Sequence, residues 1–115
     1  LYRGPPRVWL GWWLAASVGF KRQDLIICLS HIGYYYKSDP DRICDLQLAK
    51  ATKDIDLIIG GHTHTVLPKP TVAQNSEGKN VLVNQVGCYG INLGRIDFYF
   101  DTDKNKAANG TSIIV

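Results

Sequence analysis

The segment Ile58-Ile59-Gly60-Gly61-His62-Thr63-His64-Thr65 decides the fold of this chain. It ends an apolar run that begins at Ile55, and an apolar run of this length bounded by glycine predicts a buried strand. Gly60 and Gly61 can adopt positive φ, which allows the backbone to turn tightly against a ligand. The two histidines after them are one residue apart, so in an extended chain they project to the same side. A strand end therefore presents two imidazoles, which are common metal ligands.

A second apolar run upstream has the same arrangement. Leu25-Ile26-Ile27-Cys28-Leu29 is followed by Ser30-His31. We predict a strand from Asp24 to Ser30, buried on both faces as parallel strands are. With a short helix from about Ile43 to Thr52 and a second strand from Ile55 to Ile59, the pattern indicates a βαβ unit.

The two strand ends predict one metal site. Ligands of such sheets bind beyond the carboxyl ends of the strands. Neighbouring strands are about 5 Å apart, so His31 and His62 can converge on one ion if their strands are close in the sheet. The plain structural alternative is that these are hydrogen-bonded or solvated turn histidines, since a single His-x-His motif is weak evidence for a metal.

The sequence after Thr65 predicts mostly β-strands. We expect a short edge strand at 71–73, a turn at 75–78, and strands at 81–86 and 91–100, with a bulge at Gly94. Residues 101–110 are polar and predict a hairpin turn or a frayed tail. The predicted fold class is therefore α/β, with a βαβ unit followed by antiparallel strands.

The composition and charge of the chain limit the kinds of partner that it could bind. The chain has 115 residues, enough for one small domain, and a formal net charge of +3. Four bases precede the first acid, Asp24, and the other nine of the thirteen bases are matched by ten acids. This balance argues against a nucleic acid polymer as a partner. The three cysteines form no CxxC pair, and their odd number argues against a disulfide framework.

Residues 1–20 differ in character from the rest of the chain. The apolar stretch from Val8 to Ala16 comes after two arginines, as in a signal peptide. It is shorter than the ~20 residues needed to span a bilayer, so a membrane partner is not expected. A buried or interfacial helix and a segment foreign to the domain are the alternatives. The chain contains no methionine, so we expect a fragment, a processed product or a partial gene model.

Five stretches of the sequence resemble one known family. They are Asp24-Leu-Ile-Ile-Cys-Leu-Ser-His-Ile-Gly33, Asp45-Leu-Gln-Leu-Ala49, Ile55-Asp-Leu-Ile-Ile-Gly-Gly-His-Thr-His-Thr65, Val83-Asn-Gln-Val-Gly87 and Leu93-Gly-Arg-Ile-Asp-Phe98. The chain resembles the calcineurin-like metallophosphoesterases from about Asp24 to Asp101. Within them it is most similar to the 5′-nucleotidase and 2′,3′-cyclic phosphodiesterase family of bacterial cell envelopes.

The resemblance implies a fold and an activity. The fold is part of a metallophosphoesterase sandwich, with the second half of the catalytic domain at residues 21–103 and a tail at 104–115. The activity is hydrolysis of nucleotide phosphomonoesters with two divalent ions, Zn²⁺, Mn²⁺ or Fe, in the periplasm or cell envelope. His31 and His62 are expected to ligate one ion and His64 the other.

The sequence also departs from this family. The Asp-x-His, Gly-Asp and Gly-Asn-His motifs of the family's first half do not occur in the chain. Three imidazoles with no bridging carboxylate cannot hold two divalent ions. We therefore expect at most one ion and an inert chain, and we assign no catalytic or substrate-binding residue. The alternative is a non-catalytic module that binds one metal ion or pairs through an exposed sheet edge.

Other residues carry smaller predictions. Asn84 and Gly87 lie near the predicted sheet end, where a role in backbone geometry is favoured over a role in the site. The tyrosines at 34–36 either line a substrate cleft or are solvated. Arg95 and Asp97 lie on one face of a strand and are expected to flank each other at the surface.

Overall fold

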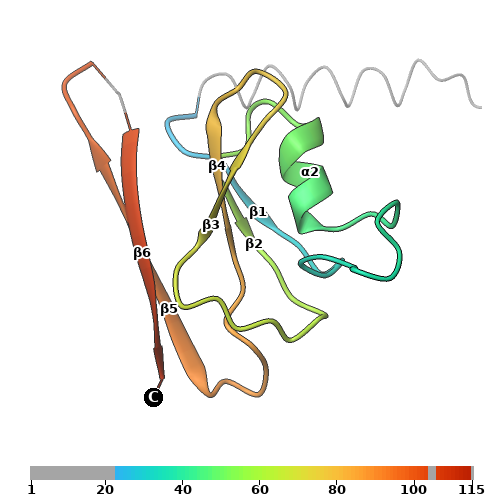
Figure 1. Cartoon of the computed structure of the whole chain (residues 1–115). Helices are drawn as coiled ribbons and strands as arrows, with labels where there is room; N and C mark the ends of the chain where they lie inside the picture. Colours follow the sequence, from blue (N-terminus) through green and yellow to red (C-terminus); the bar gives the residue numbers. More distant parts are fainter. Residues whose placement is uncertain (1–22, 104–105, 115) are drawn as a thin grey trace, which may run out of the picture.

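A four-stranded sheet carries a helix on one face and a two-stranded hairpin on the other side (Figure 1). The structure is a computed structural model that describes residues 23–103 and 106–114. Its elements in chain order are β1 (Ile27–Leu29), α2 (Asp45–Ala51), β2 (Leu57–Ile59), β3 (Thr71–Gln74), β4 (Asn80–Asn84), β5 (Asn92–Phe100) and β6 (Lys106–Ile114). The predictions for residues 1–20 lie outside the described residues.

The predicted βαβ unit is confirmed. Strands β1, β2 and β4 are parallel neighbours, and β3 is antiparallel to β4 at the far edge, in the order β1-β2-β4-β3. Helix α2 has Asp45 in its first turn and Lys50 in its last, charges that complement the helix dipole. The helix ends at Ala51, and the hydroxyl of the C-cap residue Thr52 donates a hydrogen bond to Leu48 O at 2.9 Å.

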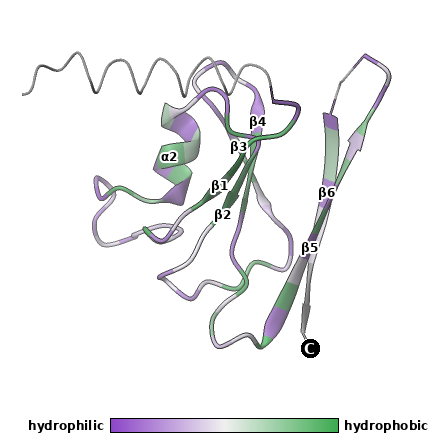
Figure 2. Ribbon diagram, turned by 180° about the vertical axis from the view of Figure 1, so that it is seen from behind, coloured by the Kyte–Doolittle hydropathy of each residue, from purple (hydrophilic) through white to green (hydrophobic). Residues whose placement is uncertain are grey.

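The hydrophobic core lies between α2 and the sheet. Its buried members come from the helix and from three strands: Ala49, Ile58, Ala73, Val81 and Val83. Side chains alternate across a strand, so fully buried Ile58 on β2 is followed by exposed Ile59. Figure 2 shows β1 and β2 coloured as hydrophobic.

Burial of β1 on both faces was predicted and is wrong. Leu29 is 79% exposed and Ile27 is 48% exposed. Among the described residues β1 pairs with β2 alone, so it is an edge strand, and its side away from α2 is open.

Strands β5 and β6 form a regular antiparallel hairpin. Their register is continuous from Asn92 opposite Ile114 to Phe100 opposite Lys106. Gly94 pairs with Ser112 inside this register, so the predicted bulge is wrong. A Cβ at Gly94 would lie 2.9 Å from both Asn84 Nδ2 and the Val86 side chain, so this glycine permits close packing near the end of β4.

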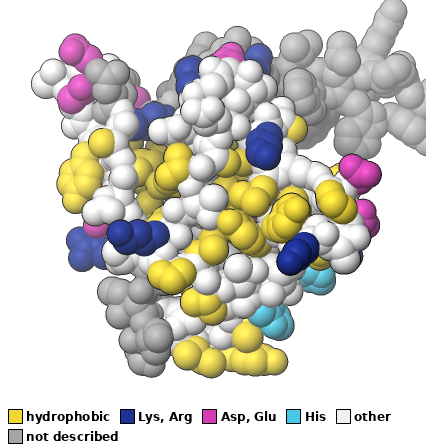
Figure 3. Space-filling view, in the orientation of Figure 1, with side chains coloured by type: hydrophobic (Ala, Val, Ile, Leu, Met, Phe, Trp, Pro, Cys, Tyr) yellow, Lys and Arg dark blue, Asp and Glu magenta, His cyan; other side chains and the backbone are white. Residues whose placement is uncertain are grey.

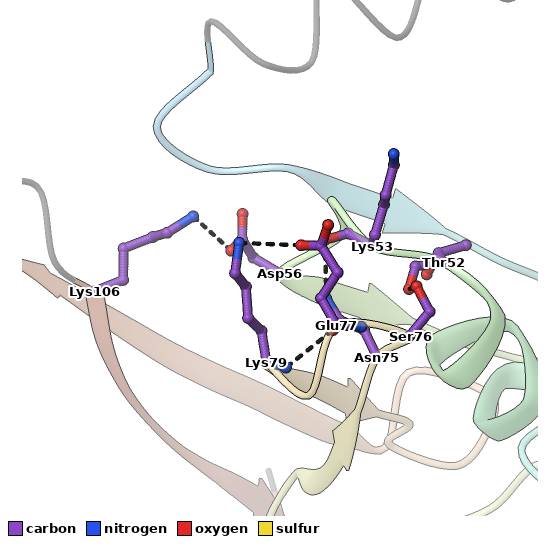
Figure 4. Close-up of polar contacts among 8 residues, drawn as sticks. All are labelled: Thr52, Lys53, Asp56, Asn75, Ser76, Glu77, Lys79 and Lys106. Carbon is purple, nitrogen blue, oxygen red and sulfur yellow. Dashed lines mark hydrogen bonds and ion pairs between the residues drawn. The ribbon is translucent and has the colours of Figure 1, made fainter.

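The hairpin is also tied to the start of β2. Lys106 Nζ donates to Asp56 Oδ1 at 2.5 Å (Figure 4). Asp56 Oδ2 also accepts a hydrogen bond from Ile26 N at 2.8 Å. Residues 106–114 form strand β6, in the region where the sequence predicted a hairpin turn or frayed tail at 101–110 and a tail at 104–115. In the part of the chain that the structure describes, no helix has the length and apolar character required to cross a bilayer.

Candidate metal centre

The carboxyl ends of three parallel strands meet at one edge of the sheet. The ladder continues one residue beyond the strands, because Ser30 N donates to Ile59 O and Gly60 N donates to Asn84 O, both at 2.9 Å. His31 follows the first of these strand ends and Gly61 the second. Segments that are far apart in the sequence therefore reach the edge at which ligands of such sheets bind.

His31 and His62 lie together at this edge. Their ring centroids are 5.3 Å apart, with an interplanar angle of 69°. Two imidazoles on one tetrahedral Zn²⁺, with Zn–N bonds of about 2.0–2.1 Å, have ring centroids about 5 Å apart. Both side chains are exposed, so solvent and further ligands can reach them. Figure 3 shows histidine side chains at the molecular surface. The separation of the two rings is therefore of the size that a shared ion requires.

His64 does not complete this pair into a three-ligand site. Its ring packs against Tyr89, with centroids 6.0 Å apart. Across residues 23–103 and 106–114, no three or more His, Cys, Asp or Glu side chains are grouped so that they could hold a metal ion. The structure thus brings two of the three predicted ligands together and places the third beside an exposed tyrosine.

The two glycines before the histidines matter because of the space that a side chain would take, and not because of their φ angles. Gly60 and Gly61 could adopt positive φ but do not, and His62 (φ 81°) and His64 (φ 52°) take the left-handed conformation instead. A Cβ at Gly60 would collide with Asp45 Oδ2, and one at Gly61 would lie 2.9 Å from His31 Nδ1. The absence of a Cβ at Gly60 makes room for Asp45, and its absence at Gly61 lets His31 approach residues 61–65.

Comparisons with known proteins identify relatives of the chain. No family model matches the chain. The trifunctional nucleotide phosphoesterase protein YfkN of Bacillus subtilis is 49% identical over 92 aligned residues, covering 75% of the chain and 6% of that protein. A 5′-nucleotidase-related protein of Glossina morsitans morsitans is 33% identical over 106 residues, covering 76% of the chain and 18% of that protein.

A solved structure is also similar to this chain. The crystal structure of a 5′-nucleotidase precursor from Thermus thermophilus matches with a TM-score of 0.69 and 31% identity, covering 86% of the chain and 20% of that structure. The chain is related to the 5′-nucleotidases. The resemblance seen in the sequence and the predicted fold class are thereby confirmed. The chain spans 6% to 20% of the length of these three proteins.

In this relative of the 5′-nucleotidases, the buried side chain of Asp45 holds the residue before His31. It is fully buried, and its Oδ1 accepts a hydrogen bond from Ser30 Oγ at 2.6 Å. Burial raises the pKa of this carboxyl, and the hydrogen bond from Ser30 partly opposes the rise. Its Oδ2 faces Gly60 and has no hydrogen-bond partner in the described part of the chain. Asp45 therefore fixes Ser30, and with it the start of the His31 loop.

Gln85 was not predicted from the sequence. This residue directly follows β4, is 2% exposed, and bonds to the loop that carries the other two histidines. The signal that could have found it is a polar residue immediately after a buried strand, at the edge where His31 and His62 were already expected. Tyr89 was not predicted either, and the sequence offers no pattern that pairs it with His64.

The tyrosines at 34–36 divide between structure and solvent. Tyr34 hydroxyl lies 2.7 Å from Thr71 Oγ1, and its ring packs against the core. Tyr36 hydroxyl donates to Ile32 O at 2.8 Å. Tyr35 is 48% exposed. Two of the three side chains are thus held by contacts within the domain.

The remaining predictions concern β4 and β5. Asn84 is buried, and its carbonyl accepts the Gly60 bond described above. Gly87 has φ 83°, and its N–H donates to Thr65 O at 2.8 Å, so its role is in the backbone. The surface pairing of Arg95 with Asp97 is confirmed, because Arg95 Nε donates to Asp97 Oδ1 at 3.1 Å.

Proposed function

We propose that this chain is the histidine-bearing part of a metal-dependent phosphoester hydrolase that acts on nucleotide phosphomonoesters. The observation that carries the proposal is the 5.3 Å separation of the His31 and His62 rings at adjacent parallel strand ends. The relatives support the reaction class, since one is named a nucleotide phosphoesterase and another a 5′-nucleotidase precursor. The remaining ligands would come from a part of the protein outside this sequence.

The residues present suit one divalent ion. His31 and His62 would hold it, and His64 would contribute to a second ion when ligands from elsewhere are present. A bound divalent ion would polarise the phosphate and lower the pKa of a bound water. Imidazole ligands suit Zn²⁺, Mn²⁺ and Fe alike.

We expect the chain by itself to be inactive. Two ions need a bridging carboxylate, and the two oxygens of buried Asp45 lie against Ser30 Oγ and Gly60. Occupancy would therefore stop at one ion per chain. The names of two relatives, a snake venom 5′-nucleotidase and a 5′-nucleotidase precursor, support an extracellular or envelope location.

Titration with Co²⁺ and Zn²⁺ tests the proposal. Wild type should bind one ion, and His31→Ala and His62→Ala should each weaken binding at least tenfold, while His64→Ala retains it. Adenosine monophosphate and a generic phosphomonoester should show no hydrolysis above buffer at any metal concentration. A wild-type chain that binds no ion, or binding that survives both His31→Ala and His62→Ala, would refute the proposed site.

One observation favours a second candidate, an interaction module that performs no chemistry. Edge strand β1 exposes Ile27 and Leu29, and an unpaired strand edge can receive a strand from another chain. Under this candidate, Leu29→Lys would reduce association measured by sedimentation and leave metal affinity unchanged. A monomeric chain at all concentrations would contradict self-pairing through β1.

A further inference from the structure

The side chain of Gln85 bonds to both ends of the segment that carries His62 and His64. Its Oε1 accepts hydrogen bonds from Thr65 N at 2.6 Å and from Thr63 Oγ1 at 3.0 Å. Its Nε2 donates to Gly61 O at 2.9 Å. One buried amide thus makes three hydrogen bonds to residues 61–65, which it reaches from the neighbouring strand.

This segment adopts a conformation that its own residues disfavour. His62 and His64 have φ of 81° and 52°, in the left-handed region. For a residue with a Cβ this region costs roughly 1–2 kcal/mol. Residues held in such a conformation need support from the surrounding structure. The three bonds from Gln85 supply that support at the first, third and fifth positions of the segment.

Thr63 extends the same network to the loop of His31. Its hydroxyl accepts a hydrogen bond from Tyr34 N at 3.0 Å and lies 2.9 Å from Thr65 Oγ1. Tyr34 is three residues after His31. The Thr63 hydroxyl oxygen therefore connects residues 61–65 both to Gln85 and to the loop that carries His31.

We propose that Gln85, acting through Thr63, is the positioning residue that sets how the imidazoles of His62 and His31 face a divalent ion. Gln85 touches neither imidazole by a hydrogen bond, so its effect is on geometry and not on ligation. The metal part of this inference rests on the proposed function above. The structural part, that Gln85 fixes the conformation of residues 61–65, stands on the hydrogen bonds of this chain alone.

The chain contains a matched control residue. Asn75 is also a buried amide with three hydrogen bonds, two accepted by Oδ1 from Glu77 N and Lys79 N and one donated by Nδ2 to Lys53 O (Figure 4). It fixes the turn between β3 and β4, far from the histidines in the fold. Asn75→Ala therefore removes the same chemistry as Gln85→Ala without touching the candidate site.

The experiment compares these two variants by amide NMR and metal titration. Gln85→Ala should lower the ¹H–¹⁵N NOE at His62 and His64, speed hydrogen exchange at the Thr65 amide, and weaken Zn²⁺ or Co²⁺ binding about tenfold. Asn75→Ala should loosen residues 75–79 and leave both the histidine segment and the metal affinity unchanged. Equal order at residues 61–65 in Gln85→Ala and wild type would overturn the proposal.

A second pair of variants covers failure of Gln85→Ala to fold. Thr63→Val removes the hydroxyl that Gln85 and Tyr34 share and keeps the shape of the side chain. Thr63→Ser keeps the hydroxyl and removes only the methyl group. Loss of order at 62–64 in the first and recovery in the second would support the network; the same order in both would overturn it. If wild type binds no ion, the proposed metal site fails, and the NMR comparison still decides the role of Gln85.

Discussion

Gly60 and Asp45 touch in a way that leaves no room for a side chain at position 60: a Cβ there would collide with Asp45 Oδ2. The residue struck is a buried carboxylate that also holds Ser30. The neighbouring Gly61 differs, because a Cβ there would meet the side chain of exposed His31, which can move. The two adjacent glycines therefore have separable roles.

We predict that Gly60→Ala lowers the free energy of unfolding by about 2–3 kcal/mol, as overpacking in a filled core does. Gly61→Ala should lower it by less than about 1 kcal/mol, because an exposed side chain can rotate away. The same Gly61→Ala change should weaken metal binding by displacing His31. Urea denaturation and Co²⁺ titration measure the two effects, and equal unfolding midpoints for the two variants would contradict the packing argument.

Asp45 gives the chain a pH-dependent stability. Its folded-state pKa is raised by burial, so its contribution to stability is complete below the unfolded pKa and is lost as pH rises through the folded value. Asp45→Asn cannot ionise, and its side-chain oxygen can still accept from Ser30. The stability of Asp45→Asn relative to wild type should therefore increase as pH rises from about 3.5 upward, past the unfolded pKa of about 3.9. A pH-independent difference between the two unfolding free energies would show that this carboxyl does not titrate as argued.

The ion pair between Lys106 and Asp56 fastens the hairpin to the sheet, and the two partners should respond unequally. Lys106→Ala removes one partly exposed pair and should cost less than about 1 kcal/mol. Asp56→Ala also leaves Ile26 N without its acceptor, which adds about 1–3 kcal/mol. Unfolding in urea at low and high salt measures both. The exposed pair of Lys79 with Glu77, 3.2 Å apart, is the control, and Lys79→Ala should change stability by less than about 0.5 kcal/mol.

Replacing a left-handed histidine by glycine should stabilise the chain and impair its site. His62→Gly relieves a conformation that costs about 1–2 kcal/mol and introduces the entropy cost of glycine, about 0.5–1 kcal/mol. A rise in melting temperature together with loss of metal binding is expected. Tyr89, with φ 61° and 88% exposed, is the control, because Tyr89→Gly should give the same stabilisation and leave the ion at His31 and His62 bound.

Strands marked by a continuous apolar run were predictable from the sequence. The apolar runs at Leu25–Leu29 and Ile55–Ile59 gave two parallel strands, and their ends gave the approach of His31 to His62. Local pattern sufficed because both strands end in polar residues at the same edge. The antiparallel strands β3 and β4 followed from the turn residues between them.

Features that depend on distant contacts were not predictable. The sequence suggested that Gly60 and Gly61 serve a tight turn through positive φ, but the requirement for glycine comes from Asp45 and His31, which approach from other parts of the chain. The exposure of Leu29 depends on which strands lie beside β1, and an apolar run alone does not carry that information. Gln85 was missed because its three partners lie twenty or more positions away.

The strand order β1-β2-β4-β3 has a consequence for how the chain folds. The β3–β4 hairpin closes a short local loop, whereas pairing of β4 with β2 requires closure of a much longer one, and non-local parallel pairing is slow. Gln85 arrives at the histidine segment only when β4 docks beside β2. Kinetic intermediates that contain the hairpin but not this parallel pair would therefore lack an ordered His62 loop, and the capacity to capture an ion would emerge in the final folding step.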